Sequence, residues 1–296
     1  MAQPLYKNLS IHPISEKYLK RWSVGMRKEK NSLYFDLIRL FKSLKLKKDK
    51  VIALQTRLFE VCTFYKLSPH EVCATLIDIL NLICKDKTIL LPAFSNDIIK
   101  FKKFDIERSL PNTGMFPKYC LNLKKFRRSI YPLHSFLISG PKTEEILKLK
   151  QITTWGKGGI FEWLEINNAK WIAINLKWKN GCAFGHRAEE LTQVPYRHYK
   201  TYEGKFFKKG KFIKIISEKK YSNYLEAKIK FDYSIFDKVM KHDEIFCYLN
   251  KGLYARSCNT KTITKNLVSL FLKHPFAFVK NQNYVKRWLS KNIKKR

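Results

Sequence analysis

Apolar residues between positions 31 and 94 alternate between the spacing of helices and that of strands. Over 32–45 they fall three and four residues apart, as on one face of an amphipathic helix: Leu33, Leu37, Leu40, Phe41 and Leu44. The apolar run 51–54 predicts a short buried strand. The segment Ser68-Pro69-His70-Glu71 is a capping box with proline at the first helical position, and it predicts a helix that runs to about Cys84. Residues 88–94 predict a second apolar strand.

The pattern becomes more varied after this point. Residues 95–130 are polar and predict loops, and loops of such length are often functional. The further elements are expected in this order: a strand near 133–138, helices near 142–149 and 159–167, a strand over 170–176, and a hairpin over 206–212 with its turn at Lys209-Gly210. Beyond 220 the pattern is mostly helical.

Helices and strands that alternate in this way predict an α/β protein. We expect a three-layer α/β/α core with a mixed sheet, plus a mostly helical C-terminal region. The chain divides into a basic N-terminal extension (1–30), a core that carries the chemistry (31–220) and a helical C-terminal region packed on that core (221–296). Coverage of a substrate cleft is one hypothesis for the last region.

The composition is globular, with 45% hydrophobic residues, but the chain is strongly basic. It has 59 Lys and Arg against 24 Asp and Glu, for a formal net charge of +35. The lysines are spread along the whole chain, so a general lysine-rich bias is one explanation. The other is an anionic partner, such as nucleic acid, an acidic membrane surface or a phosphate-bearing small molecule. No zinc, helix-turn-helix or RNP pattern is found, so no nucleic-acid partner is expected.

Nothing in the sequence predicts export or a membrane span. The first residues lack the apolar region of a secretory signal, and the longest apolar run, 74–84, falls short of the roughly 18 residues of a membrane helix. The seven cysteines form no C-x-x-C pair, which favours reduced, mostly buried thiols and no metal site. We expect a cytoplasmic protein, with a peripheral position at the inner membrane surface as an open alternative because 267–296 mixes aromatic residues with lysines.

A histidine and a glutamate follow the expected strand 170–176 at helical spacing. His186 and Glu189 lie at i and i+3, after the turn Lys179-Asn180-Gly181. Sites in α/β sheets form beyond the carboxyl ends of strands. A histidine can take a proton from an amine near neutral pH, and a neighbouring carboxylate can orient its ring. Such pairs are also common on helices without any catalytic role, and the spacing alone leaves that alternative open.

Five segments together resemble the aminoglycoside 3-N-acetyltransferase family, over about 33–204. The family's Pro-Thr-Phe-Thr strand end is similar to Pro92-Ala93-Phe94-Ser95, and its Gly-x-Leu-x-Glu turn to Gly114-Met115-Phe116-Pro117-Lys118. Its Arg-Ser-x-His-Pro-x-His-Ser-Phe segment resembles 128–136, and its Phe-Gly-x-Gly-Ser turn resembles 155–159. The family signature Thr-x-x-His-x-x-Glu is similar to 183–189.

The chain departs from these motifs at several positions. Ala183 stands in place of the signature threonine, Tyr131 in place of the first family histidine, Lys118 in place of the turn glutamate and Gly159 in place of the turn serine. A donor must face the thioester oxygen, which becomes negative during the reaction. Because Ala183 offers no side-chain donor, we expect a backbone amide or Ser135 to replace it.

The resemblance implies acetyl-CoA as the acyl donor, without a metal, and it implies roles for particular residues. His186 becomes the general base, and Glu189 orients its ring. Contacts with CoA are implied for Arg128, Ser129, His134, Ser135 and Thr56. Two of these residues also have an alternative without a role in binding: Arg128 can belong to a solvated basic loop, and His134 can be a buried histidine with satisfied hydrogen bonds. Contacts with the acceptor are expected at Tyr196, Arg197 and Asn112.

The sequence therefore predicts an N-acetyltransferase that acts on a small aminosugar. A polycationic aminoglycoside would be repelled by this basic chain, whereas a nucleotide- or lipid-linked aminosugar would be attracted to it. Residues 194–200 also resemble family members from surface-polysaccharide biosynthesis, such as lipopolysaccharide. We therefore expect an activated aminosugar as acceptor, with aminoglycoside resistance as the alternative. A non-catalytic or nucleic-acid-binding basic protein is the alternative of another class. The oligomeric state stays open, a dimer included.

Overall fold

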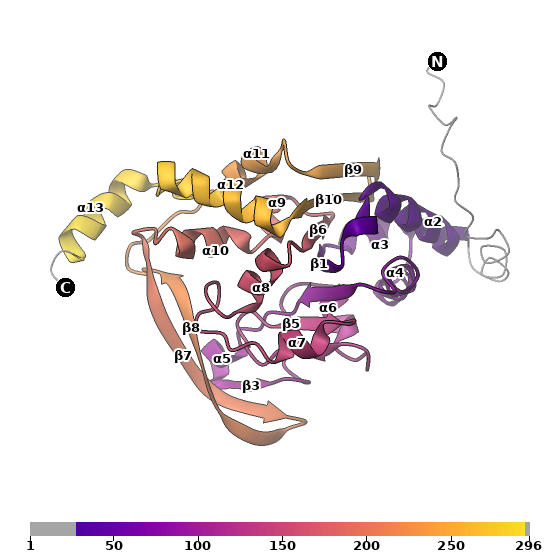
Figure 1. Ribbon diagram of the computed structural model, residues 1–296, viewed down its shortest axis with the longest axis horizontal. Helices are drawn as coiled ribbons and strands as arrows, with labels where there is room; N and C mark the ends of the chain where they lie inside the picture. The colour runs from indigo at the N-terminus through magenta and orange to yellow at the C-terminus, as the bar shows by residue number, and fades with distance from the viewer. Residues whose placement is uncertain (1–27, 294–296) are drawn as a thin grey trace, which may run out of the picture.

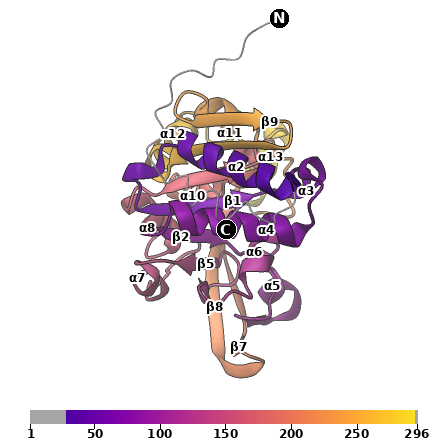
Figure 2. The same ribbon diagram turned by 90° about the vertical axis from the view of Figure 1, so that its right-hand side faces the viewer.

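A mixed sheet of seven strands lies at the centre of the molecule, with helices on both of its faces (Figures 1 and 2). This computed structural model describes residues 28–293, so nearly all of the expected N-terminal extension lies outside the described part. The strand order is β4-β5-β2-β1-β6-β10-β9. The strands are β1 (Val51–Thr56), β2 (Thr88–Pro92), β4 (Arg127–Arg128), β5 (Phe136–Ser139), β6 (Lys170–Ile174), β9 (Ile245–Asn250) and β10 (Leu253–Asn259).

The three central strands β2, β1 and β6 are parallel to one another and buried on both faces. Successive side chains of a strand point to opposite faces. In β1, Ile52 and Leu54 accordingly enter one hydrophobic cluster, whereas Val51 and Ala53 enter the cluster on the other side. Continuous apolar runs such as 51–54 are typical of parallel strands covered on both sides, and the expected three-layer α/β/α core is confirmed.

Helices from different parts of the chain cover the two faces. On the first face lie α2 (Lys28–Ser43), α3 (Phe59–Tyr65), α4 (Pro69–Ile83) and α6 (Met115–Cys120), with the short 3₁₀ turn η1 (Leu46–Lys48) after α2. On the second face lie α7 (Thr143–Leu147), α8 (Ile160–Ile166), α9 (Trp178–Gly181), α10 (Phe184–Leu191), α11 (Ser234–Met240), α12 (Thr260–Lys273) and α13 (Gln282–Asn292).

The capping box predicted before α4 is present. The Ser68 hydroxyl accepts a hydrogen bond from the Glu71 backbone N–H, and the Glu71 carboxylate accepts one from the Ser68 backbone N–H. The two helices expected near 142–149 and 159–167 are also present, as α7 and α8, and are shorter than the pattern indicated.

A long hairpin extends from the body of the molecule (Figure 1). It consists of β7 (Arg197–Lys208) and β8 (Lys211–Asn223), and with β3 (Lys103–Asp105) it forms a separate three-stranded sheet. Helix α5 (Asp97–Phe101) packs beside it. The predicted turn at Lys209-Gly210 is confirmed, but the hairpin is much longer than the expected 206–212. Both strands are rich in charged side chains and mostly exposed, so the apolar signal is weak outside that segment.

The C-terminal region contains the expected helices, α11 to α13, and also two strands that the sequence pattern did not indicate. Strand β10 pairs antiparallel with β6, and β9 pairs with β10 at the edge of the main sheet. Residues of the C-terminal region therefore complete the sheet of the core. Strand β9 is exposed at alternate positions, although five of its six residues are hydrophobic, and the mostly helical prediction for the region beyond 220 missed it.

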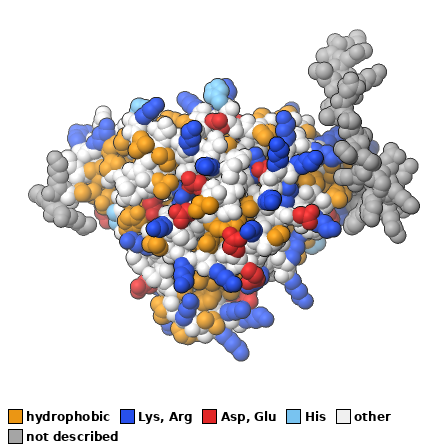
Figure 3. Space-filling view, in the orientation of Figure 1, with side chains coloured by type: hydrophobic (Ala, Val, Ile, Leu, Met, Phe, Trp, Pro, Cys, Tyr) orange, Lys and Arg blue, Asp and Glu red, His pale blue; other side chains and the backbone are white. Residues whose placement is uncertain are grey.

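The surface agrees with the composition. Lysine and arginine side chains are scattered over the face in Figure 3, with apolar and acidic side chains between them. All seven cysteines are free thiols, and Cys73, Cys84, Cys120 and Cys258 are buried, as expected. Within 28–293, none of the helices has the length and apolar character needed to span a bilayer.

Candidate active site

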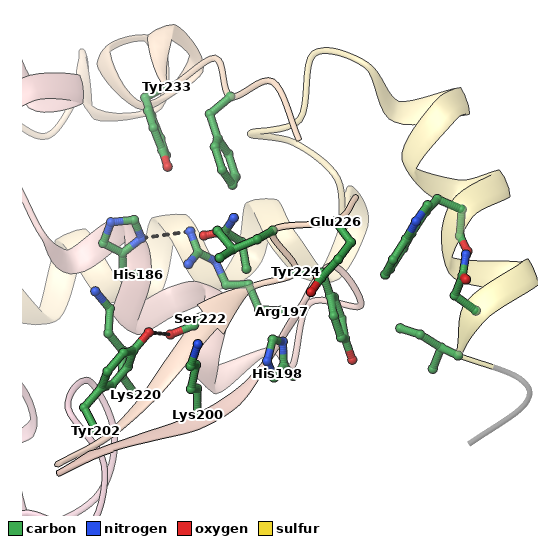
Figure 4. Close-up of a pocket in the computed structure, with 16 residues that line it drawn as sticks. His186, Arg197, His198, Lys200, Tyr202, Lys220, Ser222, Tyr224, Glu226 and Tyr233 are labelled. Carbon is green, nitrogen blue, oxygen red and sulfur yellow. Dashed lines mark hydrogen bonds between the residues drawn. The ribbon is translucent and has the colours of Figure 1, made fainter. Parts of the chain in front are cut away.

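His186 lines a cavity of about 590 Å³ between the base of the long hairpin and the C-terminal helix α13 (Figure 4). Helix α10 carries His186 and begins shortly after β6 leaves the sheet. The two strands of the hairpin form a second wall, Trp288 and Asn292 contribute from α13, and Ile293 contributes from just beyond its end. Part of the C-terminal region thus lines the cavity.

Close packing fixes the position of α10. Phe184 and Ala188 are fully buried in the core, and Gly185 lies against Phe278, where a Cβ would be 3.1 Å from the ring. The His186 ring points into the cavity, and 33% of the His186 side chain is exposed. The imidazole is therefore open to a ligand, unlike a histidine sealed in a core.

His186 and Glu189 are brought together, as their spacing leads one to expect. Nδ1 of His186 lies 2.7 Å from Oε2 of Glu189, whose side chain is fully buried. A carboxylate can only accept, so Nδ1 carries the proton and donates it. Among residues 28–293, no protein group is hydrogen-bonded to Nε2, which keeps its lone pair.

Tyr196 and Arg197, which the sequence assigned to acceptor binding, hold Glu189 instead. The Tyr196 hydroxyl donates to Oε1 of Glu189 at 2.8 Å, and Nη2 of Arg197 lies 2.9 Å from Oε2. Tyr196 has no exposed surface, so it cannot contact an acceptor. Arg197 does line the cavity, beside the His186 ring (Figure 4). Both residues therefore position the carboxylate that positions the histidine.

The electrostatic surroundings keep His186 neutral and Glu189 charged. Burial lowers the pKa of His186, the Glu189 carboxylate opposes this, and the charges of Arg197 and Lys220 lower the pKa further, so it lies below its usual value. Burial alone would raise the pKa of Glu189, but Arg197, His186 and Tyr196 together hold it below its usual value. An unprotonated imidazole beside an ionised carboxylate is the form that can accept a proton.

A tight turn supports the other side of the ring. Trp155 lies with its ring centroid 5.1 Å from that of His186, and His134 lies behind it at 3.7 Å. Arg187 of α10 donates to the backbone oxygen of Trp155 and so ties the turn to the helix. His134 is buried and does not line the cavity; its Nδ1 has no hydrogen-bond partner within the described residues and lies 4.0 Å from Oε1 of Glu218. Burial lowers its pKa far below the usual value, as do the charges of Lys220 and His186. His134 is therefore buried, as that alternative has it, but its Nδ1 is not satisfied by a hydrogen bond within the described residues.

Arg128, Ser129 and Ser135 have structural contacts that do not support the expected role in CoA binding. The buried Arg128 guanidinium donates to the Ser135 hydroxyl and to the backbone oxygens of Ser109 and Ala93. The Ser135 hydroxyl in turn donates to Ala93, and the Ser129 hydroxyl accepts from the backbone N–H of Phe136. Because these groups are already engaged, Ser135 also cannot replace the missing threonine at Ala183 as a donor.

Thr56 and Asn112 are not among the residues that line the cavity. Thr56 ends β1, and its buried hydroxyl is without a partner in the described part of the chain. Asn112 is exposed, and its backbone N–H donates to the backbone oxygen of Phe94. Neither position supports the contacts expected from the sequence.

The sequence reasoning missed most residues of the cavity wall. They share the hairpin and the segment that follows it: His198, Lys200, Tyr202, Lys220, Ser222, Tyr224, Glu226 and Tyr233. The signal that could have found the first five is the alternation 198, 200, 202 and 220, 222, which places them on one face of two paired strands. The hairpin was predicted too short for this alternation to be read.

The chain is similar to proteins of one family in both sequence and fold. A family model described as aminoglycoside 3-N-acetyltransferase matches residues 68–274, more than half of the 296 residues. No curated protein sequence matches the chain.

Several solved structures share the fold. The apoenzyme of aminoglycoside acetyltransferase AAC(3)-IVa matches with a TM-score of 0.66 and 15% identity, over 86% of this chain and 96% of that one. Sisomicin-bound AAC-VIa matches with a TM-score of 0.66 and 15% identity, over 80% and 97%. The binary complex of AAC-IIIb with CoASH matches with a TM-score of 0.65 and 16% identity, over 81% and 96%. At these identities the likeness shows a common fold.

Proposed function

The chain belongs to the aminoglycoside 3-N-acetyltransferase family, and from this premise we propose that it transfers an acetyl group from acetyl-CoA to the amine of a small aminosugar, with His186 as general base. Membership makes it an acetyl-CoA-dependent N-acetyltransferase. The observation that carries the proposal is the His186–Glu189 pair at the wall of an open cavity.

The pair provides what an amine nucleophile requires. An amine is largely protonated near neutral pH and cannot attack until it loses a proton. Glu189 accepts from Nδ1 of His186 and thereby leaves Nε2 as the basic nitrogen. When the ring takes the proton, it becomes an imidazolium beside a buried carboxylate that already carries a negative charge. Glu189 therefore both fixes the tautomer and stabilises the protonated ring.

The cavity also offers groups for the acyl donor. When bound, acetyl-CoA supplies the acetyl group as a thioester. The Tyr233 hydroxyl points into the cavity near His186 (Figure 4) and can donate to an acyl oxygen in place of the missing threonine at Ala183. Lys200 and Lys220 present ammonium groups to the same cavity, as phosphate-bearing ligands require. The residues of this cavity fit CoA better than the engaged Arg128 does.

For the acceptor, an aminoglycoside is the first candidate. The family is described by this substrate class, and the similar AAC-VIa structure is a complex with sisomicin. The second candidate is a nucleotide- or lipid-linked aminosugar. One observation favours it: Glu226 is the only carboxylate among the residues that line this cavity, whereas Arg197, Lys200 and Lys220 are all basic. A polycation is repelled by such a wall, and a phosphate is attracted.

The test is acetyl-CoA consumption with a panel of aminoglycosides, free aminosugars and nucleotide-linked aminosugars. His186→Gln keeps a polar side chain but removes the base, and we expect kcat/KM to fall about 10²- to 10⁴-fold. His242 is exposed and does not line the cavity, and His242→Gln is the matched control. Unchanged turnover in His186→Gln would remove this histidine from the mechanism.

A further inference from the structure

One face of the hairpin near its base is directed into the cavity. His198, Lys200 and Tyr202 alternate along β7, and Lys220 and Ser222 alternate along β8. The strand register places Lys200 directly opposite Lys220, and His198 directly opposite Ser222. In Figure 4 the amines of both lysines point into the cavity, Lys220 toward the His186 ring. Two ammonium groups therefore share one wall of the cavity that contains His186.

The two carboxylates near this lysine pair, Glu218 and Glu226, form no ion pair with it within residues 28–293. Like charges directly opposite each other on a sheet are destabilising. Arg197 is already paired with Glu189. Glu218 precedes Lys220 on β8, and its charge favours the charged form of Lys220. Its buried carboxylate is engaged elsewhere, since it accepts from the Leu133 backbone and from the side chains of Gln151 and Thr154. The structure records no ion pair for either lysine within residues 28–293.

The neighbouring groups suit an anion. The Lys200 amine lies over the Tyr202 ring, 5.5 Å from its centroid, which limits its range of positions. The Tyr202 and Ser222 hydroxyls are 3.4 Å apart, and either can donate to an oxygen. Burial, together with the charge of Arg197, lowers the pKa of Lys220 to about 8. A bound anion would relieve the repulsion that contributes to this shift.

We infer that Lys200, Lys220 and Ser222 form a subsite for a phosphate group of a ligand whose reacting end lies at His186. This inference rests on the proposed function and names the ligand chemistry that the same cavity selects. Phosphate oxygens would accept from the two ammonium groups and from the hydroxyl. The phosphate has two possible sources, the phosphates of CoA or a phosphate ester on the acceptor.

The experiment compares Lys200→Gln and Lys220→Gln with Lys219→Gln as the matched control. Lys219 neighbours Lys220 on β8, but it is exposed, and its amine lies over the Tyr199 ring instead of lining the cavity. Lys200→Arg and Lys220→Arg retain the charge and should retain binding. Calorimetry measures the affinity of the intact protein for CoA, inorganic pyrophosphate, glucosamine and glucosamine 6-phosphate, and thermal unfolding checks that each variant is folded.

Loss of either lysine should lower the affinity for one of the phosphate-bearing ligands about tenfold. If the glutamine variants bind CoA and pyrophosphate more weakly but bind glucosamine and glucosamine 6-phosphate as before, the phosphate comes from the acyl donor. If the affinity for glucosamine 6-phosphate falls and the affinity for CoA does not, the phosphate comes from the acceptor. If Lys200→Gln and Lys220→Gln bind each of the four ligands as tightly as Lys219→Gln does, the proposed subsite is wrong. These binding measurements need no turnover. A protein that acetylates none of the tested amines would refute the proposed function, and the binding data would still show whether the phosphate subsite exists.

Discussion

At the scale of single residues, the site is organised around the buried carboxylate of Glu189. Three groups donate to its two oxygens: the His186 ring, the Tyr196 hydroxyl and the Arg197 guanidinium. A buried charge is costly unless it is paired and hydrogen-bonded, and here both conditions are met. Tyr196 and Arg197 therefore hold the carboxylate beside His186. Tyr196 is too buried to contact an acceptor, whereas Arg197 also lines the cavity.

The charge of Arg197 should be visible in the pH dependence of the reaction. The base is active when unprotonated, and burial and Arg197 lower the pKa of His186. The acid limb of kcat/KM should therefore lie below about 6.5, the usual histidine pKa. In Arg197→Met the loss of a positive charge raises the pKa of His186, so the limb moves to higher pH. The measurement is kcat/KM against pH for wild type and variant.

Tyr196→Phe is the control for this prediction. It removes one hydrogen bond to Glu189 but no charge, so the limb should move less than in Arg197→Met. A limb that stays in place when Arg197 is lost, or that moves to lower pH, contradicts the proposed role of Arg197.

At the scale of elements, the turn before α8 connects the ring of His186 with the core. Trp155 sits in this turn, and Gly158 has a φ of +76°, a left-handed backbone conformation that favours glycine. A Cβ at Gly158 would also meet the backbone oxygen of Lys150. The turn thus requires glycine at position 158, and the turn in this conformation places Trp155 against the His186 ring.

Gly158→Ala should destabilise the protein by about 1–3 kcal/mol because both the positive φ and the contact with Lys150 oppose a side chain. Thermal unfolding measures this. Gly159→Ser is the control: its φ of −95° is ordinary, and its nearest neighbour is the flexible side chain of Gln151. The same loss of stability in both variants would show that the backbone conformation is not the cause.

At the scale of the whole molecule, the net charge of +35 and the basic cavity wall act in the same direction. Exposed charges separated by more than about 8 Å are largely screened at physiological ionic strength. Long-range attraction of a phosphate-bearing ligand should therefore weaken as salt is added, and so should the repulsion of a polycation.

The salt dependence of KM should accordingly have opposite signs for the two acceptor classes. Between about 10 mM and about 150 mM salt, KM should rise for acetyl-CoA and for a nucleotide-linked aminosugar, and it should fall for an aminoglycoside. Initial rates at fixed ionic strengths measure this. A KM for acetyl-CoA that does not change with salt would show that the net charge plays no part in binding.

Local patterns were sufficient for much of the fold and for one part of the site. Strands β1, β2 and β6 are apolar runs, the start of α4 is a capping box, and His186 and Glu189 are neighbours on a single helical turn. Each of these depends on residues within a few positions of one another, so their spacing alone carries the information.

The tertiary structure alone decided which other groups meet His186. Arg128 and Ser135 matched a motif, yet the fold buries them and saturates their hydrogen bonds, whereas Lys200 and Lys220 reach the cavity because two exposed strands pair in a particular register. Residues of β10 and β9 extend the central sheet, and α13 lines the cavity, although these segments are far from His186 in sequence. Contacts of this kind join segments far apart in sequence, and their energies come from packing and pairing that no local pattern records.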